Sequence, residues 1–508
     1  MSVSQNIAGL LDIMWNHGRT LATLFLSTAL TGCMVGPNFH SPRAPETSTY
    51  TESPQPKKTL STPKAGSAGK SQYFLSGKDI PAEWWTLFHS QELDGLIRKG
   101  LANSPNLVAA EAALREAQQT LIAQIATSFI PQVSAQFSGT RQRASTATFV
   151  GVNSSNVFSL YNASVNVAYT LDMFGGARRE IEALRDQVDF QRFEWEGAYL
   201  TLTSNIVTTA ITAASLRAQI AATYDLIKSQ QRQLMIVERQ FHVGGVSRAD
   251  VLTQQAQLAQ TRATLPPLEQ SLAQSNHALS VLIGELPSEN HIPKFNLTQL
   301  NLPSQLPMSL PSRLVRQRPD IRASEALLAA ASAQIGVATA NLFPQLSLTG
   351  SYGGTDTTIS HLFSARNVVW NYGGSLLQPL FNGGALYAKK RAAVAAYEQA
   401  AAQYRQTVLQ AFQNVADTLR ALQHDAETLQ AEKEAEVASQ NSLALTQKQF
   451  HLGGVSYLSL LTAERQYQQT RIALIQAEAA RYNDTAALFQ ALGGGWWNRK
   501  EVTICKIN

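Results

Sequence analysis

The residues of this chain that could do chemistry are nine histidines, thirty-six acids and two cysteines. His242 and His451 stand at equivalent places beside two similar turns, so we interpret them as repeated turn residues and not as metal ligands. Carboxylate pairs such as Glu432 and Glu434 fit the solvated face of a helix. The sequence holds no HExxH, GxSxG, Walker-type or CxxC motif. We therefore predict no catalytic residue, no metal site, no cofactor and no enzymatic activity.

An apolar stretch of roughly ten residues ends in the letters LTGC, of which Cys33 is the last. With Arg19 before it, the stretch has the length of a signal-peptide core and is too short to span a bilayer. The ending resembles a bacterial lipobox, in which cleavage leaves the cysteine as an acylated first residue. We predict a signal peptide over residues 1–32 and lipidation at Cys33. The alternative is an uncleaved apolar N-terminus with an incidental cysteine.

The position after Cys33 indicates the destination of such a lipoprotein. Met34 stands where lipoproteins retained in the inner membrane usually carry aspartate, so the resemblance to a lipobox points to the outer membrane. Several acyl chains anchor a protein firmly, whereas one chain is marginal. Residues 33–72 are rich in Pro, Ser, Thr and Lys without a helical or strand period, and we expect a lipid-anchored tether that is extended or wraps along the surface. Residues 493–508 are expected to form a C-terminal tail.

The rest of the chain is a tandem duplication. The segment QFHVGGVSRADVLTQQAQLAQTRATL at residues 240–265 returns as QFHLGGVSYLSLLTAERQYQQTRIAL at residues 449–474, with about half of the positions identical. Shorter matches run in the same order: PNLVAAEAAL with PDIRASEALL, FIPQVS with LFPQLS, and MFGGA with FNGGA. Because the repeated unit is far longer than a solenoid repeat, each copy is expected to be a whole module. We place the first repeat at 73–300 and the second at 301–492.

The composition limits the class of partner. Only 15% of the residues are charged, and the net charge is +5 over 508 residues. A charge this dilute, without a cluster of Lys and Arg among aromatic residues, does not indicate nucleic-acid binding. We expect a polar but weakly charged surface.

Each repeat predicts a helix followed by two strands. Pro105 opens the first of these helices, which is expected to end near Ser128. The strands alternate apolar and polar residues and have the length that crosses a bilayer when tilted. Four strands cannot close a barrel by themselves, so strands in a membrane would require an oligomer; the alternative is a soluble two-sided sheet. The predicted strands are 132–142, 157–171, 345–352 and 367–380.

Very long helices follow the strands. We predict helices over about 177–242 and 385–451, each on the order of 100 Å long, with returning helices over about 247–284 and 456–492. Apolar residues recur near every 3.5 positions in the predicted helix over 385–451, which is typical of a coiled-coil seam. Such helices could line an aqueous conduit or form a solvated rod. The seam residues are Val394, Tyr397, Ala401, Tyr404, Val408, Ala411, Val415, Leu419, Leu422, Ala426 and Leu429.

The turns between these helices read VGGVS at 243–247 and LGGVS at 452–456. A glycine pair supplies a left-handed C-cap, and the serine is a good N-cap for the next helix. Both repeats keep the apolar residues and the serine at a place where we expect no core to need them. By itself the turn pattern is only structural, and this repetition is what raises it above that.

These residues resemble those of the TolC-type outer-membrane factors, and within them the NodT-like efflux lipoproteins. The matching stretches are CMVGPNF at 33, WWTLF at 84, RQRPDIRASEALLAAASAQIGVATANLFPQLSLTG at 316, PLFNGGAL at 379 and ALGGGW at 491. The resemblance implies an α+β membrane protein that is a homotrimer. Each chain would give four strands to a shared twelve-stranded β-barrel, continued by a long periplasmic α-helical barrel. An equatorial mixed domain would come from residues near 73–103, 286–318 and the C-terminal end.

The resemblance also implies sites. The helical tips of this family meet a periplasmic membrane-fusion adaptor, and the start of the last long helix constricts the entrance. Leu458 matches an apolar constriction position. Ser459 and Thr462 stand where relatives carry aspartates, and only Asp250 in the first repeat keeps such an acid. The tip residues carried over are Gly244, Gly245, Val246, Ser247, Gly453, Gly454, Val455 and Ser456.

The function implied is a passive outer-membrane exit duct of a tripartite efflux system. It would conduct small molecules from an inner-membrane pump of the RND type or similar, through the adaptor, to the exterior of a Gram-negative cell. The chain would contact outer-membrane lipid and would bind no nucleic acid. Two alternatives stay open: a type I protein-secretion duct, and a non-conducting lipid-anchored coiled-coil spacer.

Overall fold

A computed structural model describes residues 34–143, 157–289 and 291–499, and the predicted signal peptide, Cys33 and most of the tail lie outside them. The chain forms two compact units. One combines Met1–Pro42, Ala113–Gln191 and Ser324–Tyr404; the other combines Arg43–Ala112, Arg192–Ala323 and Arg405–Asn508. Each unit draws on both repeats. The compact units therefore cut across the repeats instead of following them.

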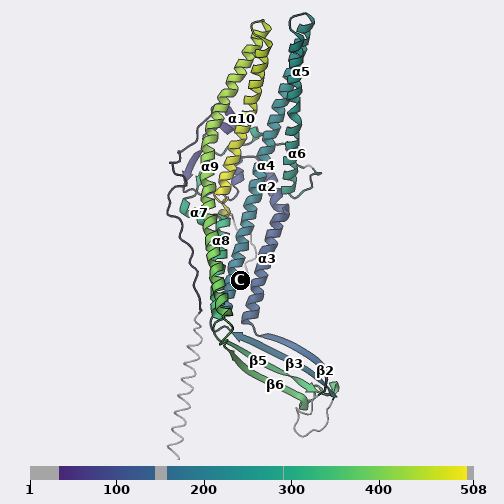
Figure 1. Cartoon of the computed structure of the whole chain (residues 1–508), viewed down its shortest axis with the longest axis vertical. Coiled ribbons are helices and arrows are strands. Elements are labelled where there is room, and N and C mark those ends of the chain that lie inside the picture. The colour runs from purple at the N-terminus through teal and green to yellow at the C-terminus, as the bar shows by residue number, and fades with distance from the viewer. Residues whose placement is uncertain (1–33, 144–156, 290, 500–508) are drawn as a thin grey trace, which may run out of the picture. The chain divides into compact units, whose positions relative to one another are not determined.

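The first unit contains a four-stranded antiparallel sheet in the order β2-β3-β5-β6 (Figure 1). All four predicted strands are present. β5 runs four residues beyond the predicted end at residue 352, and β6 ends at Leu377 because Gln378 is followed by a proline, which has no backbone N–H to donate to a strand ladder. The strands are β2 (Gln132–Arg143), β3 (Val157–Leu171), β5 (Gln345–Asp356) and β6 (Val368–Leu377).

The register gives this sheet one apolar face and one polar face. A row across all four strands joins Ala135, Val165, Tyr352 and Trp370. The next row along, on the other face because side chains alternate, joins Ser134, Asn166, Ser351 and Asn371. Apolar side chains of the first face are exposed, including Trp370 at 64% and Tyr372 at 81%, whose rings stack at 5.6 Å.

The helices before and after the strands occupy equivalent places in the two repeats. α3 (Pro105–Phe129) precedes β2, and α8 (Pro319–Ala340) precedes β5. After the strands come α4 (Gly176–His242) and α9 (Ala385–His451), each 67 residues long without a break. Both agree with prediction to within one residue. No helix of the described ranges is long and apolar enough to cross a bilayer.

In the second unit the long helices turn back as two helical hairpins that lie side by side (Figure 1). α9 returns as α10 (Tyr457–Ala491), as predicted. The prediction of one helix over 247–284 is wrong, because the chain divides at Thr264 into α5 (Arg248–Ala263) and α6 (Leu265–Leu282). Two prolines follow Leu265, and proline lacks the N–H that an interior helical position needs.

The coiled-coil seam of α9 is buried from Val408 onward. Residues earlier in the pattern, from Val394 to Tyr404, are only half-buried in the single chain. Small alanines within the seam let neighbouring helices approach closely. The buried seam residues are Val408, Ala411, Val415, Leu419, Leu422, Ala426 and Leu429.

Segments far apart in sequence form a mixed α/β belt in the second unit. β1 (Tyr73–Ser76) pairs in parallel with β4 (Gln305–Met308). The buried rings of Trp84 and Phe489 stack at 5.4 Å. These contacts confirm the predicted mixed domain from residues near 73–103, 286–318 and the C-terminal end. Its other elements are η1 (Pro63–Gly69), η2 (Trp84–Phe88), α2 (Gln91–Asn103), η4 (Leu297–Gln299), α7 (Pro311–Gln317) and η7 (Trp496–Asn498).

Candidate functional site

The two helical turns have the same backbone structure. The amide of Gly245 donates to the Gln240 carbonyl at 2.7 Å and that of Gly244 to Phe241 at 3.0 Å. Gly244 has a φ of +78°, a region that residues with a Cβ rarely adopt. This pair of bonds is the Schellman motif, which satisfies the last carbonyls of a helix.

The second repeat reproduces that motif. Gly454 donates to Gln449 at 2.8 Å, Gly453 donates to Phe450 at 3.0 Å, and the φ of Gly453 is +76°. The left-handed glycine caps expected from the sequence are therefore confirmed in both repeats.

The serines that follow the glycines cap the returning helices, also as expected. The Ser247 hydroxyl accepts from the Asp250 amide at 3.2 Å, and Asp250 Oδ2 accepts from the Ser247 amide at 2.9 Å. In the second repeat Ser456 accepts from the Ser459 amide at 3.3 Å, and the two hydroxyls lie 3.0 Å apart. One oxygen of Asp250 is thus held by hydrogen bonds in a capping box. Ser459, the equivalent residue of the second repeat, carries no charge.

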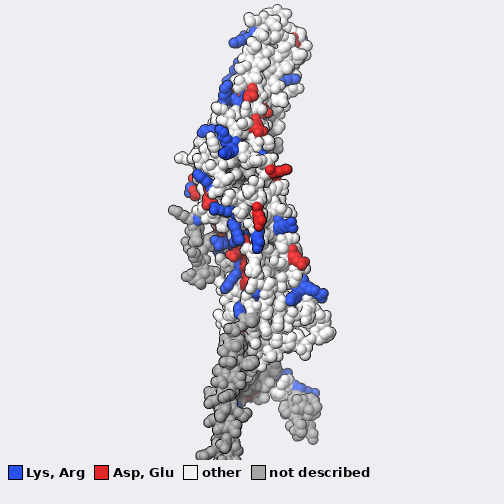
Figure 2. Space-filling view, turned by 90° about the vertical axis from the view of Figure 1, so that its left-hand side faces the viewer, with Lys and Arg blue, Asp and Glu red and all other residues white. Residues whose placement is uncertain are grey.

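The outermost residues of the turns are exposed and uncharged. Val243 and Leu452 are 83% and 87% exposed. A Cβ added to Gly244 or Gly453 would meet no atom within 4 Å. Charged side chains are sparse at this upper end of the hairpins (Figure 2). The tips therefore offer backbone and small apolar side chains to any partner.

A small core lies directly beneath the turns. Val246 and Val455 pack against it, so the expectation that no core needs the apolar tip residues is wrong for these two. It holds for Val243 and Leu452. The core draws on all four helices of the two hairpins and fastens them to each other. Its buried members are Val237, Val251, Phe450, Tyr457 and Leu460.

Three of the four residues assigned to the entrance constriction lie together on one face of α10, and the fourth, Asp250, lies in the first turn of α5. Leu458 is 67% exposed, and Ser459 and Thr462 are exposed beside it. Thr462 Oγ1 donates to the Leu458 carbonyl at 2.9 Å, one helical turn earlier. The opposite face of α10, which carries Leu460, is buried. The chain thus presents an apolar and hydroxyl face at this position, without an acid.

Glutamines between α5 and α10 form a polar seam that was not predicted from the sequence. Tyr457 donates its hydroxyl hydrogen to Gln254 Oε1, and Gln254 Nε2 donates to the Gln230 carbonyl at 3.2 Å. Arg465 Nε donates to Gln257 Oε1 at 2.5 Å. Gln254 and Gln257 are three residues apart and so lie on one face of α5, which is the sequence feature that could have predicted this seam.

The segment that follows Cys33 is held at the start of α4. The buried Arg179 guanidinium donates to the Val35 carbonyl at 3.2 Å, the Gly36 carbonyl at 3.3 Å and Asn38 Oδ1 at 2.7 Å. A Cβ on Gly36 would lie 2.5 Å from the Gly336 Cα, so two glycines let the backbones touch. Residues 34–38 are therefore docked and not a free tether. Cys33 itself lies outside the described residues.

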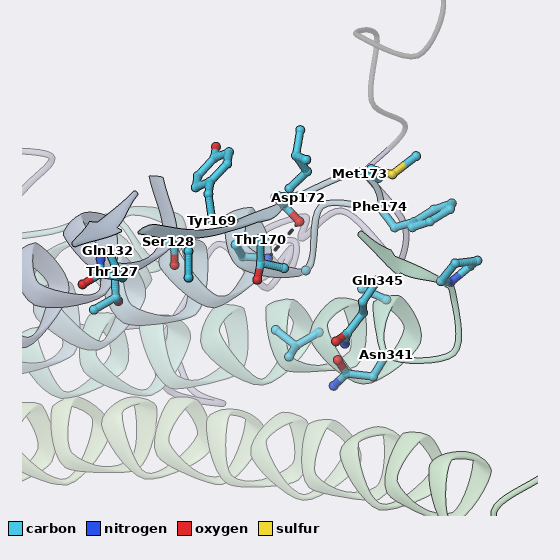
Figure 3. A pocket seen from close by; sticks show the side chains of 17 residues that line it. Thr127, Ser128, Gln132, Tyr169, Thr170, Asp172, Met173, Phe174, Asn341 and Gln345 are labelled. Atoms are coloured by element: carbon cyan, nitrogen blue, oxygen red, sulfur yellow. Dashed lines mark hydrogen bonds between the residues drawn. The ribbon is translucent and has the colours of Figure 1, made fainter. Parts of the chain in front are cut away.

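A cavity of about 350 Å³ lies where the strands of the first unit meet α4 and α8 (Figure 3). Its one carboxylate, that of Asp172, accepts from the Ala177 and Arg178 amides at 3.1 and 3.0 Å and from Arg178 Nε at 3.0 Å. Asp172 therefore caps the start of α4. The remaining polar wall is made of hydroxyls and amides, including Thr170 and Asn341.

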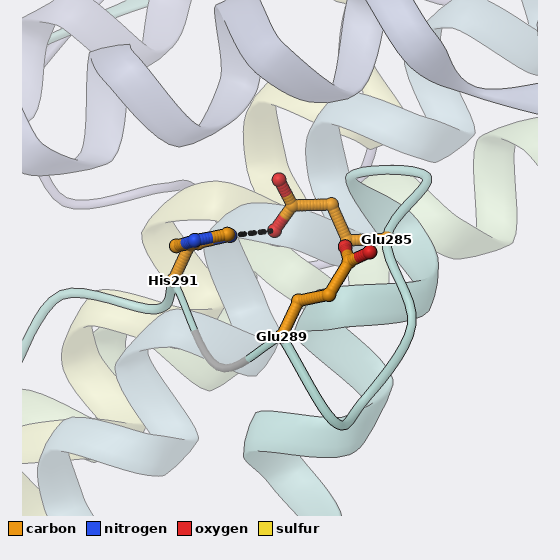
Figure 4. Close-up of side chains that lie close together, drawn as sticks. All are labelled: Glu285, Glu289 and His291. Atoms are coloured by element: carbon orange, nitrogen blue, oxygen red, sulfur yellow. Dashed lines mark hydrogen bonds and ion pairs between the residues drawn. The ribbon is translucent and has the colours of Figure 1, made fainter.

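Three ligand-type side chains converge elsewhere, at Glu285, Glu289 and His291 (Figure 4). Lys99 pairs with one Glu285 oxygen, and His291 Nδ1 lies 3.3 Å from the other. Lys99, and then His291, lower the pKa of Glu285. Because Glu285 already has a cation partner, we interpret this cluster as a surface ion-pair network.

The chain is similar to known outer-membrane proteins in both sequence and fold. The profile of the family described as "Outer membrane efflux protein" matches residues 96–285 and 310–494. Pyoverdine export outer membrane protein OpmQ of Pseudomonas aeruginosa is 29% identical over 86% of this chain and 93% of its own length. The probable efflux pump outer membrane protein TtgC of Pseudomonas putida is 29% identical over 92% of this chain and 94% of its own length. Cation efflux system protein CusC of Escherichia coli K12 is 28% identical over 92% of this chain and 98% of its own length.

Solved structures agree with these sequence matches. The outer-membrane channel OprN superposes with a TM-score of 0.82 at 27% identity, covering 91% of this chain and all of OprN. A crystal structure of CusC superposes with a TM-score of 0.77 at 26% identity, with the same coverage of both chains. The Campylobacter jejuni CmeC channel shares the fold, with a TM-score of 0.82 at 21% identity over 92% of this chain and 96% of CmeC.

Proposed function

The chain belongs to the outer membrane efflux protein family, and we propose how its parts divide the work of an outer-membrane efflux channel. It is the outer-membrane part of a tripartite efflux system, extends into the periplasm, and works with an adaptor and an inner-membrane pump. Conduction through this chain is passive and serves small molecules. The pump, of the RND type or similar, supplies the energy.

The sheet is the membrane-crossing part of our proposal. Its apolar face is exposed in the single chain, and its outer strands β2 and β6 have no strand partner on one side within the described residues. An open strand edge is untenable in lipid, because unpaired backbone groups there cost several kcal/mol each. Three chains joined β6 to β2 would close a twelve-stranded barrel with the polar face inward. This arrangement also argues against the non-conducting spacer, which would have no need of a two-faced sheet.

The helical tips are the adaptor-contact surface. The observation that carries this proposal is the repetition of one exposed, uncharged Schellman turn in both repeats, at Gly244–Ser247 and Gly453–Ser456. A turn with no Cβ at its outermost glycine allows another backbone to approach closely. The partner surface we expect is therefore a turn of complementary shape and low charge.

Bulky substitution tests this proposal. Gly244→Trp and Gly453→Trp should abolish export, because the added ring projects outward into space that the chain itself leaves open. Gly244→Asn is the matched control, because asparagine tolerates positive φ and is small. Trimer formation and adaptor cross-linking are measured beside export of a fluorescent substrate. Normal export by trimeric Gly244→Trp and Gly453→Trp variants would overturn the assignment.

We assign the entrance constriction to Leu458, Ser459 and Thr462. Three copies of the exposed Leu458 would form an apolar ring, and narrow apolar rings can close a pore by dewetting. Asp250 contributes less than a free acid would, because one of its oxygens is held in the capping box. The constriction is therefore proposed to close through apolar and hydroxyl contacts.

Lipidation at Cys33 completes the proposal. Its support in the described residues is the clasp of Arg179 on Val35, Gly36 and Asn38, which holds the chain immediately after the proposed anchor. An acyl group at residue 33 would thus precede a segment that is held at the beginning of α4. The anchor is tested by incorporation of labelled palmitate.

A further inference from the structure

A second cavity, of about 530 Å³, lies in the second unit between α4, α9, α10 and residues 296–298 at the start of η4. Its volume is within the range of small-molecule sites. Its wall is largely apolar, with one tyrosine and several charged groups. The lining that matters here comprises Leu226, Leu297, Leu443, Tyr467, Ile472 and Ile475.

The feature that singles out this cavity is Glu464. Glu464 is only 3% exposed, and its Oε2 atom has no hydrogen-bond partner. A buried carboxylate oxygen without a partner is costly, so native structures rarely keep one without a reason. The equivalent residue of the first repeat is the exposed Gln255, which shows that the helical hairpin does not itself require an acid there.

The charges around the cavity favour a cation. Asp225, Glu464 and Glu478 contribute carboxylates, whereas Arg471 is the only basic residue of the lining. Arg471 is moreover paired with Glu436, at 3.4 Å. An anionic ligand would therefore meet net repulsion, and a neutral one would leave the charge of Glu464 without a counter-ion.

The same geometry excludes a metal ion as the ligand and indicates an organic cation. Among the described residues, three ligand-type groups converge only at Glu285, Glu289 and His291, so Glu464 lacks the further ligands that a metal requires. Tyr467 and the aliphatic wall instead suit an apolar body, and an aromatic face also attracts a cation.

We propose that this cavity binds a protonated amine carried on an apolar body, with the Glu464 carboxylate as its counter-ion. The site is distinct from the tips and from the constriction, which lies on the opposite, exposed face of α10. Burial raises the pKa of Glu464 to about 7, so the carboxylate is mostly ionised at pH 8 and pairs with the amine there. The proposal does not depend on which molecule the channel exports.

Isothermal titration calorimetry on the full-length trimer in lipid nanodiscs at pH 8 tests the proposal. The probe is adamantan-1-amine, and adamantan-1-ol is its neutral analogue of the same shape. We expect the amine to bind and the alcohol to bind at least about tenfold more weakly, the difference that one charged hydrogen bond makes. Glu464→Gln should weaken amine binding by about the same factor, because it keeps the shape and removes the charge.

Matched variants distinguish the effect of losing this site from the effect of changing the net charge of the protein. The double variant Glu464→Gln, Gln255→Glu restores the total charge at the exposed equivalent position and should stay defective. Ala222→Leu narrows the cavity without touching a charge and should also weaken binding, whereas Glu434→Gln on the exposed face of α9 should not. Equal binding of amine and alcohol, an unaltered affinity in Glu464→Gln, or no binding to the wild-type trimer at millimolar amine would each overturn the proposal.

Discussion

Replacing Glu464 by glutamine should make the helical hairpins more stable at alkaline pH and leave them nearly unchanged at acid pH. Burial raises the pKa of this carboxyl from 4.5 to about 7. The folded hairpins therefore hold a proton that the opened chain releases between these two pH values. Their stability falls as the pH rises through that window, and the loss is complete above the folded pKa.

The magnitude follows from the size of that shift. At 1.36 kcal/mol for each pKa unit, the ionised Glu464 costs the closed state about 3 kcal/mol at pH 8. Glu464→Gln removes this cost. The variant should therefore exceed the wild type by about 3 kcal/mol in opening free energy at pH 8, and by less than about 1 kcal/mol at pH 5.

Hydrogen exchange measures the effect locally. Peptides covering the first half of α10 report the opening free energy at each pH after correction for intrinsic exchange rates. The groups facing Glu464, which include Asp225, Tyr457, Arg471 and Glu478, are the same in both proteins, so their own titration cancels in the difference. Parallel pH profiles for wild type and Glu464→Gln would show that this carboxyl does not titrate in the window.

Four further outcomes are expected. Leu460→Ala, in the core beneath the turns, should lower the opening free energy of both hairpins by about 2 to 5 kcal/mol in hydrogen exchange; exchange confined to α10 would contradict the shared core. Ser459→Asp should rebuild a capping box, stabilise α10 by about 1 kcal/mol and raise cation over anion permeability in planar bilayers. An unchanged reversal potential would count against this residue at the constriction. Arg179→Met should expose residues 34–38 to protease while the trimer persists, and continued protection would refute the clasp. Cys33→Ser should lose palmitate incorporation with the fold retained; label that remains would place the acyl group elsewhere.

The parts of the fold that depend on local pattern were predictable from the sequence. α9 was placed at its true ends because nothing interrupts its pattern between Ala385 and His451, and both turns follow from a glycine pair and a serine. The break at Thr264 was not predicted, because the similarity between residues 247–284 and the uninterrupted helix α10 was assumed to continue beyond Thr264. The second repeat has no proline at the equivalent of Pro266, so similarity concealed a local signal.

The parts that depend on packing between distant segments were not predictable. Arg179 and Glu464 look like ordinary helix-surface charges in the sequence. One becomes buried because residues 34–38 lie over it, and the other because α4 packs against α10. Neither event leaves a trace in the spacing of nearby residues. Differences between the repeats, such as Glu464 against Gln255, were the usable hint.

The near identity of the two turns has a consequence for docking symmetry. A trimer displays six almost equivalent helical turns, although its true symmetry is only threefold. A partner that contacted only these turns could not distinguish one binding position from the next, which is related to it by a rotation of one sixth of a full turn about the trimer axis. The residue after each serine breaks this degeneracy: Arg248 lies over the Phe241 ring at 5.7 Å, whereas its counterpart Tyr457 is buried in the core. For a protein that docks on these turns, we therefore expect Arg248 to help distinguish the two positions.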